Sequence, residues 1–451
     1  MHHRFTQRIT PLWIISSLLL LCFLPNLEAQ QPFEITWEKV AEMPSPLANN
    51  AVVGALVNDT FHIYSFTGID PTLDDEGISL EAWRYTPSSD SWLELPPVPD
   101  TLGKIAAGAS FVNRRIYVMG GYHVFPDGHE LSSERVHIFN PETNSWEADG
   151  APIPISTDDH IQAVWRDSLI YLVTGWHNTG NIPDVQIYDP FNDVWTAGTP
   201  VPSVGAPAYR VFGGSGVILG DEILYAGGAR VSGFSFVLGD GFRKGQINPE
   251  DPTDISWSTF SDIDALNYRA AAAVLPQAEG EMPVWIGGSN IAYNFDAIAY
   301  NGSGPVEPNE VVTMYSPSGD SLFDKTEAAP PIMDLRGIAV LGPEAWTMGG
   351  IDPAQEVLGS VYYYRVEEVS TGIESPSPEV LNWISLAPGV YQFPGQWSSG
   401  QGLLQVFDMT GRLVLEQSAL EPVLDLSQNP AGIYVLVLHE AGELRSALIP
   451  R

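Results

Sequence analysis

The chain of 451 residues is strongly acidic, with 55 Asp and Glu against 20 Lys and Arg and a formal net charge of −35. Such a surface repels phosphate backbones and anionic lipid, which disfavours binding to nucleic acid or to a membrane surface. The hydrophobic content of 44% is enough for a large core.

The first 29 residues predict a signal peptide. Arg4 and Arg8 precede an apolar stretch at residues 12–24, and Leu27-Glu28-Ala29 is typical of a signal-peptidase site with cleavage after Ala29. The apolar stretch is too short to span a bilayer comfortably, so we expect export and no membrane span after cleavage. The single cysteine, Cys22, lies inside this segment, which leaves the mature chain without a disulfide, a thiolate metal site or a cysteine nucleophile.

Residues 30–366 repeat one pattern six times, an apolar strand that ends in Gly-Gly or Thr-Gly. The final glycines are Gly68, Gly121, Gly175, Gly228, Gly288 and Gly350. Most copies continue into a second strand, a turn with Asn or Asp near Pro, and a tryptophan, which predicts a β-meander. The tryptophans are Trp92, Trp146, Trp195 and Trp257, and we expect them mostly in the core between blades.

The sixth copy has no tryptophan after its last strand, and Trp37 near the N-terminus opens the segment type that follows the others. We therefore expect the N-terminal strand to close the last blade, with Trp37 packed like the other tryptophans, and to remove the unpaired sheet edges. The steps of 53 to 62 residues between the final glycines resemble those of the kelch family. This resemblance implies an all-β fold, a six-bladed kelch-type β-propeller. Galactose-oxidase-like copper enzymes, which share this fold, are excluded because they need a cysteine cross-linked to a tyrosine.

The composition changes at residues 367–382, which predict a linker, and residues 383–451 predict a small immunoglobulin-like β-sandwich. This last segment resembles the C-terminal sorting domain of type IX secretion (Por) substrates, through residues 408–414, 424–427 and 430–434 together with Arg445 and Arg451. It departs from that family upstream, where LAPGVYQFPG replaces a Y-P-N-P-type segment. The resemblance implies export by the type IX secretion machinery to the medium or to the outer cell surface of a Gram-negative bacterium.

Residues just before each innermost strand and just after each glycine pair are expected to meet on one face of the propeller. Four cations occupy the first of these positions: Lys104, Arg210, Arg269 and Arg336. Converging guanidinium groups suit a ligand that carries a carboxylate. In the alternative interpretation, these arginines tie neighbouring blades together through backbone carbonyls.

His123, His160 and His177 are expected on the same face, next to Trp176, which could stack on a sugar ring. The histidines lack the local spacing of a metal site, so we expect no metal and no cofactor.

Two functions follow from these features. The first is an exported recognition propeller that binds protein or glycan ligands through this face. The alternative resembles the kelch-type N-acetylneuraminate epimerases (sialate mutarotases), with the arginines holding the substrate carboxylate. No catalytic residue can be assigned, because no catalytic motif matches residue by residue.

Overall fold

The computed structural model describes residues 33–368, apart from 204–208, 234, 240, 261–266, 278–279, 318 and 326–327, together with seven strands beyond residue 383 and residues 426–430. The expected signal peptide and nearly all of the expected linker lie outside the described residues. Two 3₁₀ helices are present in the described part, η1 (Asp75–Gly77) and η2 (Pro87–Ser89). None of the described helices is long and apolar enough to cross a membrane.

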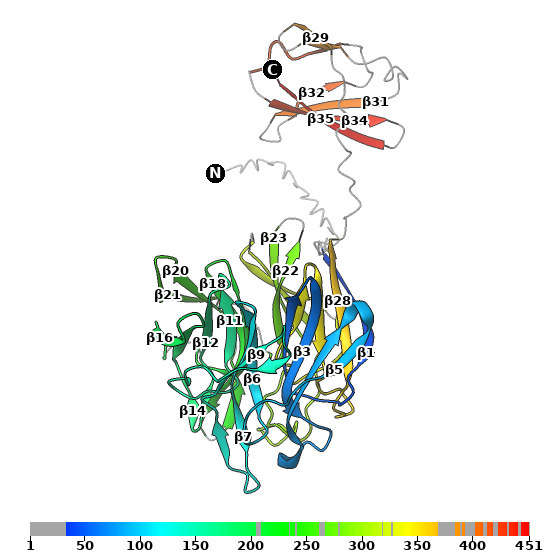
Figure 1. The fold of residues 1–451 in the computed structure, drawn as a ribbon. Coiled ribbons are helices and arrows are strands. Elements are labelled where there is room, and N and C mark those ends of the chain that lie inside the picture. Colours follow the sequence, from blue (N-terminus) through cyan, green and yellow to red (C-terminus); the bar gives the residue numbers. More distant parts are fainter. Residues whose placement is uncertain are drawn as a thin grey trace, which may run out of the picture. The chain divides into compact units, whose positions relative to one another are not determined.

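Six antiparallel sheets of four main strands each form the blades of a propeller (Figure 1). Blade 1 contains β2 (Ala51–Val57), β3 (Thr60–Ile69), β4 (Ile78–Thr86) and β5 (Ser91–Glu94). Blade 2 contains β6 (Ile105–Val112), β7 (Arg115–Val124), β9 (Val136–Asn140) and β10 (Ser145–Trp146), with β8 (Glu130–Ser132) paired to β7. Blade 3 contains β11 (Ile161–Trp165), β12 (Leu169–Val173), β15 (Val185–Asp189) and β16 (Val194–Gly198). Between β12 and β15 the chain forms a separate hairpin of β13 (Trp176–His177) and β14 (Gly180–Asn181).

Blade 4 contains β17 (Phe212–Leu219), β18 (Glu222–Ser232), β20 (Phe242–Asn248) and β21 (Asp251–Phe260), with β19 (Ser235–Leu238) paired to β18. Blade 5 contains β22 (Ala271–Gln277), β23 (Gly280–Ile286), β24 (Val312–Ser316) and β25 (Ser321–Lys325). Blade 6 contains β26 (Ala339–Leu341), β27 (Glu344–Met348), β28 (Ser360–Glu368) and β1 (Phe33–Glu42).

The sixth blade is completed by the N-terminal strand, where the sequence places Trp37. Strand β1 pairs antiparallel with β28 (Figure 1). In the register of this pair, Trp37 lies opposite Tyr364. The Trp37 ring contacts Tyr362 edge-on, with 5.9 Å between ring centroids, yet its side chain is 42% exposed. The contribution of this strand is therefore mainly its backbone pairing, and the expectation of a buried Trp37 is wrong.

The other repeat tryptophans connect neighbouring blades at their outer edges. Trp146 Nε1 donates to the carbonyl oxygen of Pro96 in the preceding blade at 2.9 Å, and Trp195 Nε1 donates to that of Ala151 at 2.8 Å. Trp257 repeats the contact with Thr199 at 3.1 Å. These side chains are half-buried. A tryptophan suits this place because its ring covers apolar surface while its N–H reaches an otherwise unpaired carbonyl.

The glycine pair has a conformational cause. The first member of each pair has a positive φ, including Thr67 (58°) and Thr174 (50°) where the pair is Thr-Gly. This region is unfavourable for β-branched residues. Thr174 is held there because its hydroxyl donates to the carbonyl of Ile182 at 2.8 Å and accepts from the N–H of Val211 at 3.1 Å.

The described strands after residue 383 form a second unit with two antiparallel sheets. One sheet contains β29 (Ile384–Ala387), β30 (Val390–Gln392) and β33 (Val423–Asp425). The other contains β31 (Gly402–Asp408), β32 (Leu413–Gln417), β34 (Ile433–Glu440) and β35 (Glu443–Pro450). The β-rich character agrees with the expectation from sequence, and the immunoglobulin-like sandwich stays a prediction.

Candidate binding site

The residues before the inner strands do meet those after the glycine pairs, on one face of the propeller. Asp158 is bridged to Trp176, Tyr268 to Ser289 and Met333 to Ile351, and the other blades make the same contact. We call this side of the molecule the glycine-pair face. It is the face on which the sequence places the candidate site.

A hydrogen-bonded ring closes the propeller axis at this face. Each blade contributes one residue with positive φ: Asn49, Ala106, Asp159, Gly213, Arg269 and Asp334. In four of the six links, the N–H of one ring residue donates to the carbonyl of the residue before it, at 2.8 to 3.1 Å. The fifth link joins the N–H of Ala106 to Asn49 Oδ1 at 2.6 Å, and the sixth joins the N–H of Leu335 to the carbonyl of Arg269 at 3.0 Å.

Side chains of the ring residues form hydrogen bonds and ion pairs with one another across the axis. Arg269 donates through Nε and Nη2 to the two carboxylate oxygens of Asp159, at 3.1 and 2.7 Å. Its Nη1 donates to Asp334 Oδ1 at 3.1 Å, and Asn49 Nδ2 donates to the same oxygen at 2.8 Å. All four side chains are buried, and burial raises the pKa of Asp334. The Arg269 guanidinium therefore has a structural role in joining blades 3, 5 and 6.

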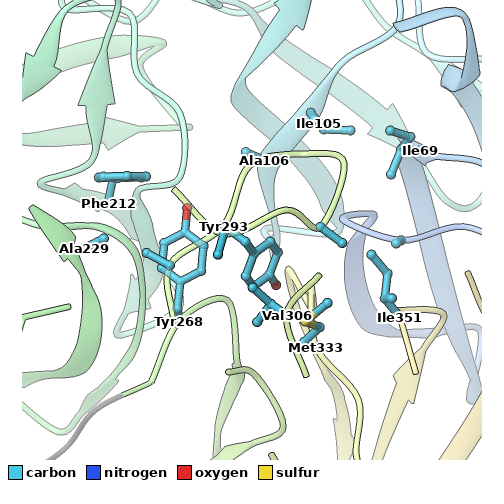
Figure 2. Close-up of a cluster of buried hydrophobic side chains, with 14 of the residues drawn as sticks. Ile69, Ile105, Ala106, Phe212, Ala229, Tyr268, Tyr293, Val306, Met333 and Ile351 are labelled. Carbon is cyan, nitrogen blue, oxygen red and sulfur yellow. The ribbon is translucent and has the colours of Figure 1, made fainter. Parts of the chain in front are cut away.

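An aromatic and aliphatic cluster covers the ring. It includes Phe212 from β17, Tyr268 next to β22, and Tyr293 from the loop of residues 289–311, which we call the blade-5 loop (Figure 2). The ring centroids of Tyr268 and Tyr293 lie 5.1 Å apart, and those of Phe212 and Tyr268 lie 5.7 Å apart, both in edge-to-face contact. The blade-5 loop thus fills the centre of the glycine-pair face.

Beside this loop, a cavity of about 120 Å³ opens on the face; we call it the aromatic pocket. Its described lining residues are Tyr122, Glu130, Asp158, Asp159, Trp176, Phe212, Phe236, Arg269, Asn294 and Tyr300. The aromatic wall is continuous, with ring centroids 5.5 Å apart for Trp176 and Phe236 and 4.4 Å apart for Phe236 and Tyr300. The pocket therefore has one aromatic wall and one acidic wall.

Two carboxyl groups of the acidic wall have no cationic partner among the described residues. Asp158 is only 3% exposed, and its Oδ2 accepts a hydrogen bond from the Ser132 hydroxyl at 2.6 Å. Burial, together with the charge of Asp159, raises the pKa of Asp158 well above its usual range, and burial also raises the pKa of Glu130. Both groups resist ionisation because the cost of their desolvation exceeds the effect of the Arg269 charge, which acts to lower both pKa values.

A second cavity, also of about 120 Å³, lies along the axis on the other side of the ring. His160 and Arg336 line it, and Arg336 Nη2 donates to the carbonyl of His160 at 3.0 Å. Arg336 Nη1 lies 3.5 Å from Asp159 Oδ1. Burial, with the charge of Arg336, lowers the pKa of His160 to about 4, so its imidazole is neutral at pH 7. Arg336 fits the alternative interpretation, in which arginines tie blades together through carbonyls.

Lys104 and His123 belong to a separate buried network. Lys104 Nζ lies 3.3 Å from Asp100 Oδ2, and the pKa of the Lys104 ammonium falls to about 8, chiefly because of burial. His137 lies between Asp100 and Asp149, at 3.1 and 2.9 Å. His123 Nδ1 donates to the carbonyl of Gly103 at 2.9 Å. None of these residues lines either cavity.

The structure thus separates the sequence-derived candidates into different places. Trp176 and Arg269 line the aromatic pocket, and His160 and Arg336 line the axial cavity. Arg210 makes no hydrogen bond or ion pair to another described residue, and His177 donates to the carbonyl of Ser156 at 2.7 Å. The four cations do not converge on one cavity. Among the described residues, no group of three His, Cys, Asp or Glu is arranged to hold a metal ion.

Sequence reasoning missed Glu130, Asp158, Phe236 and Tyr300, although they form much of the pocket. Asp158 could have been found, because it lies two residues before His160, which the sequence already places on this face. The other three lie in connections of unequal length, where no repeat fixes their position.

Residues 107–152 match the sequence pattern described as the Kelch motif. The chain carries a Kelch motif. Similar proteins include Kelch-like protein 35 of Mus musculus, 28% identical over 37% of this chain and 26% of that protein. Kelch-like protein terF of Aspergillus terreus is 25% identical over 44% of this chain and 41% of that protein. The matches therefore span less than half of the length of these relatives.

Among solved structures, the one titled "Structure of YjhT" matches with a TM-score of 0.55 and 15% sequence identity. The match covers 71% of this chain and 95% of that one. At this identity the likeness concerns the fold alone, and it agrees with the six sheets described above.

Proposed function

We propose that the chain is a recognition propeller that binds a protein or glycan ligand through the aromatic pocket on its glycine-pair face. The observation that carries the proposal is the pocket itself, which is lined both by a group of contacting aromatic rings and by two carboxyl groups without an ion-pair partner among the described residues. Kelch propellers generally bind proteins, which supports a recognition role. Loops from a rigid scaffold commonly form such sites.

The charges of the pocket weigh against the sialate epimerase alternative. That reaction calls for a cation to hold the substrate carboxylate, and Arg269 is the one cation among the described residues that line the pocket. Its guanidinium already contacts Asp159 and Asp334. An anionic sugar would also approach Glu130 and Asp158. Recognition of a ligand that is not anionic is therefore the better-supported function.

We also propose that the protein acts outside the cell. The support is the signal-like segment at residues 1–29 and the sorting-domain motifs within residues 383–451. Removal of residues 383–451 should leave a folded propeller in the periplasm. Normal amounts of the shortened chain outside the cell would contradict the proposed sorting role.

Binding to glycan and protein arrays tests the recognition function. Tyr300→Ala removes one side of the aromatic wall, and we expect it to abolish the signals that the full chain gives. Phe191→Ala is the matched control, because Phe191 is 62% exposed on a turn of blade 3 and does not line the pocket. If every signal survives Tyr300→Ala, the aromatic pocket is not the recognition site.

A further inference from the structure

Exposed aliphatic side chains lie on the segments that form the aromatic pocket, and we call Val231, Ile291 and Ile298 the aliphatic rim. Val231 is opposite Phe236 in the register of β18 and β19, so both side chains lie on the same face of this hairpin. Ile291 and Ile298 belong to the blade-5 loop, which also supplies Asn294 and Tyr300. The exposed fractions of Val231, Ile291 and Ile298 are 46%, 36% and 40%. Such groups can pack against apolar side chains of a protein partner and offer little to the hydroxyl groups of a glycan.

Inside this rim the described lining groups carry an excess of acid. The lining contains three acidic residues, Glu130, Asp158 and Asp159, and one cation, Arg269. The Arg269 guanidinium already forms ion pairs with Asp159 and Asp334. The Glu130 carboxyl group makes no hydrogen bond or ion pair to another described residue, and the Asp158 carboxyl group accepts a hydrogen bond only from the Ser132 hydroxyl among the described residues. A ligand with positive charge would compensate for the desolvation of both carboxyl groups, whereas a neutral ligand would not.

The aromatic wall favours the same kind of ligand. The faces of Trp and Tyr rings attract an ammonium or guanidinium group, and the attraction increases when water is excluded. The methylene groups of a lysine or arginine stem pack against such rings while the charged end reaches the carboxylates. The cavity of about 120 Å³ is also below the range of roughly 300 to 1,000 Å³ common for ligand pockets, and it suits a single side chain.

We propose that the aromatic pocket receives a lysine or arginine side chain of a protein partner, whose neighbouring apolar residues lie on the aliphatic rim. This inference rests on the proposed recognition function and specifies its ligand. The formal net charge of −35 supports it, because long-range attraction speeds the approach of a basic partner.

Selection from a phage library of random peptides on the full chain tests the proposal. We expect the enriched peptides to share one Lys or Arg flanked by apolar residues. The strongest binder is then synthesised twice, once unmodified and once with its lysine acetylated or its arginine replaced by citrulline. Calorimetric titration should show a loss of affinity of about tenfold or more in the neutral version.

Two isosteric variants locate the contact. Glu130→Gln and Asp158→Asn each remove one unpaired carboxyl group, and each should weaken the unmodified peptide about tenfold while its neutral version changes little. Glu134→Gln is the control, since it removes one carboxylate from an exposed position of the same blade outside the pocket. The melting temperature of each variant shows whether it is folded. If Asp158→Asn does not fold, Glu130→Gln alone decides the question.

Three results would overturn the proposal: enriched peptides without a basic residue, equal affinity for the charged and neutral peptides, or an equal effect of Glu134→Gln. Ligands that lack a basic group but lose binding in Tyr300→Ala would preserve the recognition function while refuting the basic side chain. If no peptide, glycan or protein depends on the pocket, both the recognition function and this inference fail.

Discussion

Arg269 of blade 5 and Asp159 of blade 3 form a two-pronged ion pair at the propeller axis, at 2.7 and 3.1 Å, with both side chains at most 2% exposed. The two residues occupy equivalent positions in blades that are not neighbours. Asp334 of blade 6 binds the remaining edge of the guanidinium. The pair therefore joins parts of the ring that the sheets themselves do not connect.

Replacement of Arg269 tests this role. Arg269→Met leaves Asp159 and Asp334 buried without their main cation, and we expect the free energy of unfolding to fall by about 3 to 5 kcal/mol. Urea unfolding at pH 7 measures the loss. Arg210→Met is the control and should change stability by less than about 0.5 kcal/mol, since Arg210 bonds to no other described residue. If Arg269 belonged to an empty anion site, its replacement would instead leave the free energy of unfolding unchanged or raise it.

Asp158→Asn should stabilise the ligand-free protein at pH 7. The folded-state pKa of Asp158 is raised, so the native chain holds its proton while the unfolded chain releases it above the ordinary Asp pKa. The wild type consequently loses stability as the pH rises above about 4, and the asparagine variant does not. We expect a gain of about 1 kcal/mol or more at pH 7 that disappears near pH 3. A constant difference between pH 3 and pH 7 would contradict the buried, uncompensated carboxyl.

Asp100→Asn should have the opposite effect. Although burial acts to raise it, the pKa of Asp100 is lowered by the hydrogen bond from His137 and by the charge of Lys104. A depressed carboxyl pKa stabilises the fold above the unfolded-state pKa of about 4, and this stability is lost as the pH falls. We expect Asp100→Asn to destabilise by about 2 kcal/mol or more at pH 7 and by less at pH 3. Parallel stability curves of variant and wild type would refute the network.

Gly227→Ala tests the geometry of the glycine pairs. Gly227 has φ +65°, and a Cβ there would lie 1.9 Å from the carbonyl oxygen of Asn267 in the next blade. Gly220 has a similar φ of +58° and nothing within 4 Å of the same point. Gly220→Ala should cost about 1 kcal/mol from backbone strain alone, and Gly227→Ala clearly more. Equal melting temperatures of the two variants would contradict this geometry, because they would show that the two blades move apart at Gly227 without loss of stability.

The closing strand depends on its backbone more than on its tryptophan. Trp37→Ala should cost about 1 kcal/mol because Trp37 is 42% exposed. Deletion of residues 33–42 should do much more, since it leaves the edge of β28 unpaired. Light scattering and thermal unfolding compare the two chains. A monomeric deletion variant with the wild-type melting temperature would contradict closure through β1.

Much of the fold could be predicted from the repeat. A glycine equivalent to Gly68 recurs in every blade, because the backbone adopts the same unusual conformation there each time. The N-terminal strand could be assigned by counting tryptophans, but the exposure of Trp37 could not, because the tryptophans on the outer strands of the other blades are half-buried. The site was less predictable. Arg269 occupies the ring position of blade 5, whereas Arg336 lies two residues after the ring residue of blade 6, Asp334. The partners of both arginines come from other blades, and a repeat does not encode which charge lies across the axis.

The aromatic pocket was the least predictable part. Its walls come from the insertions that differ among blades, such as Glu130 on β8, Phe236 on β19 and Tyr300 in the blade-5 loop. Their composition shows neither helical nor strand periodicity, so sequence alone could not bring them together.

The hydrogen-bonded ring also fixes the order of the blades. Four of its links join the backbones of ring residues, and the occupants of the ring position are Asn49, Ala106, Asp159, Gly213, Arg269 and Asp334. A change in blade order that moves blade 5 relative to blades 3 and 6 would separate Arg269 from its two aspartates. A circular permutation, which keeps the cyclic sequence of blades, preserves every pairing. The ion pairs at the axis therefore favour one cyclic order of the six blades.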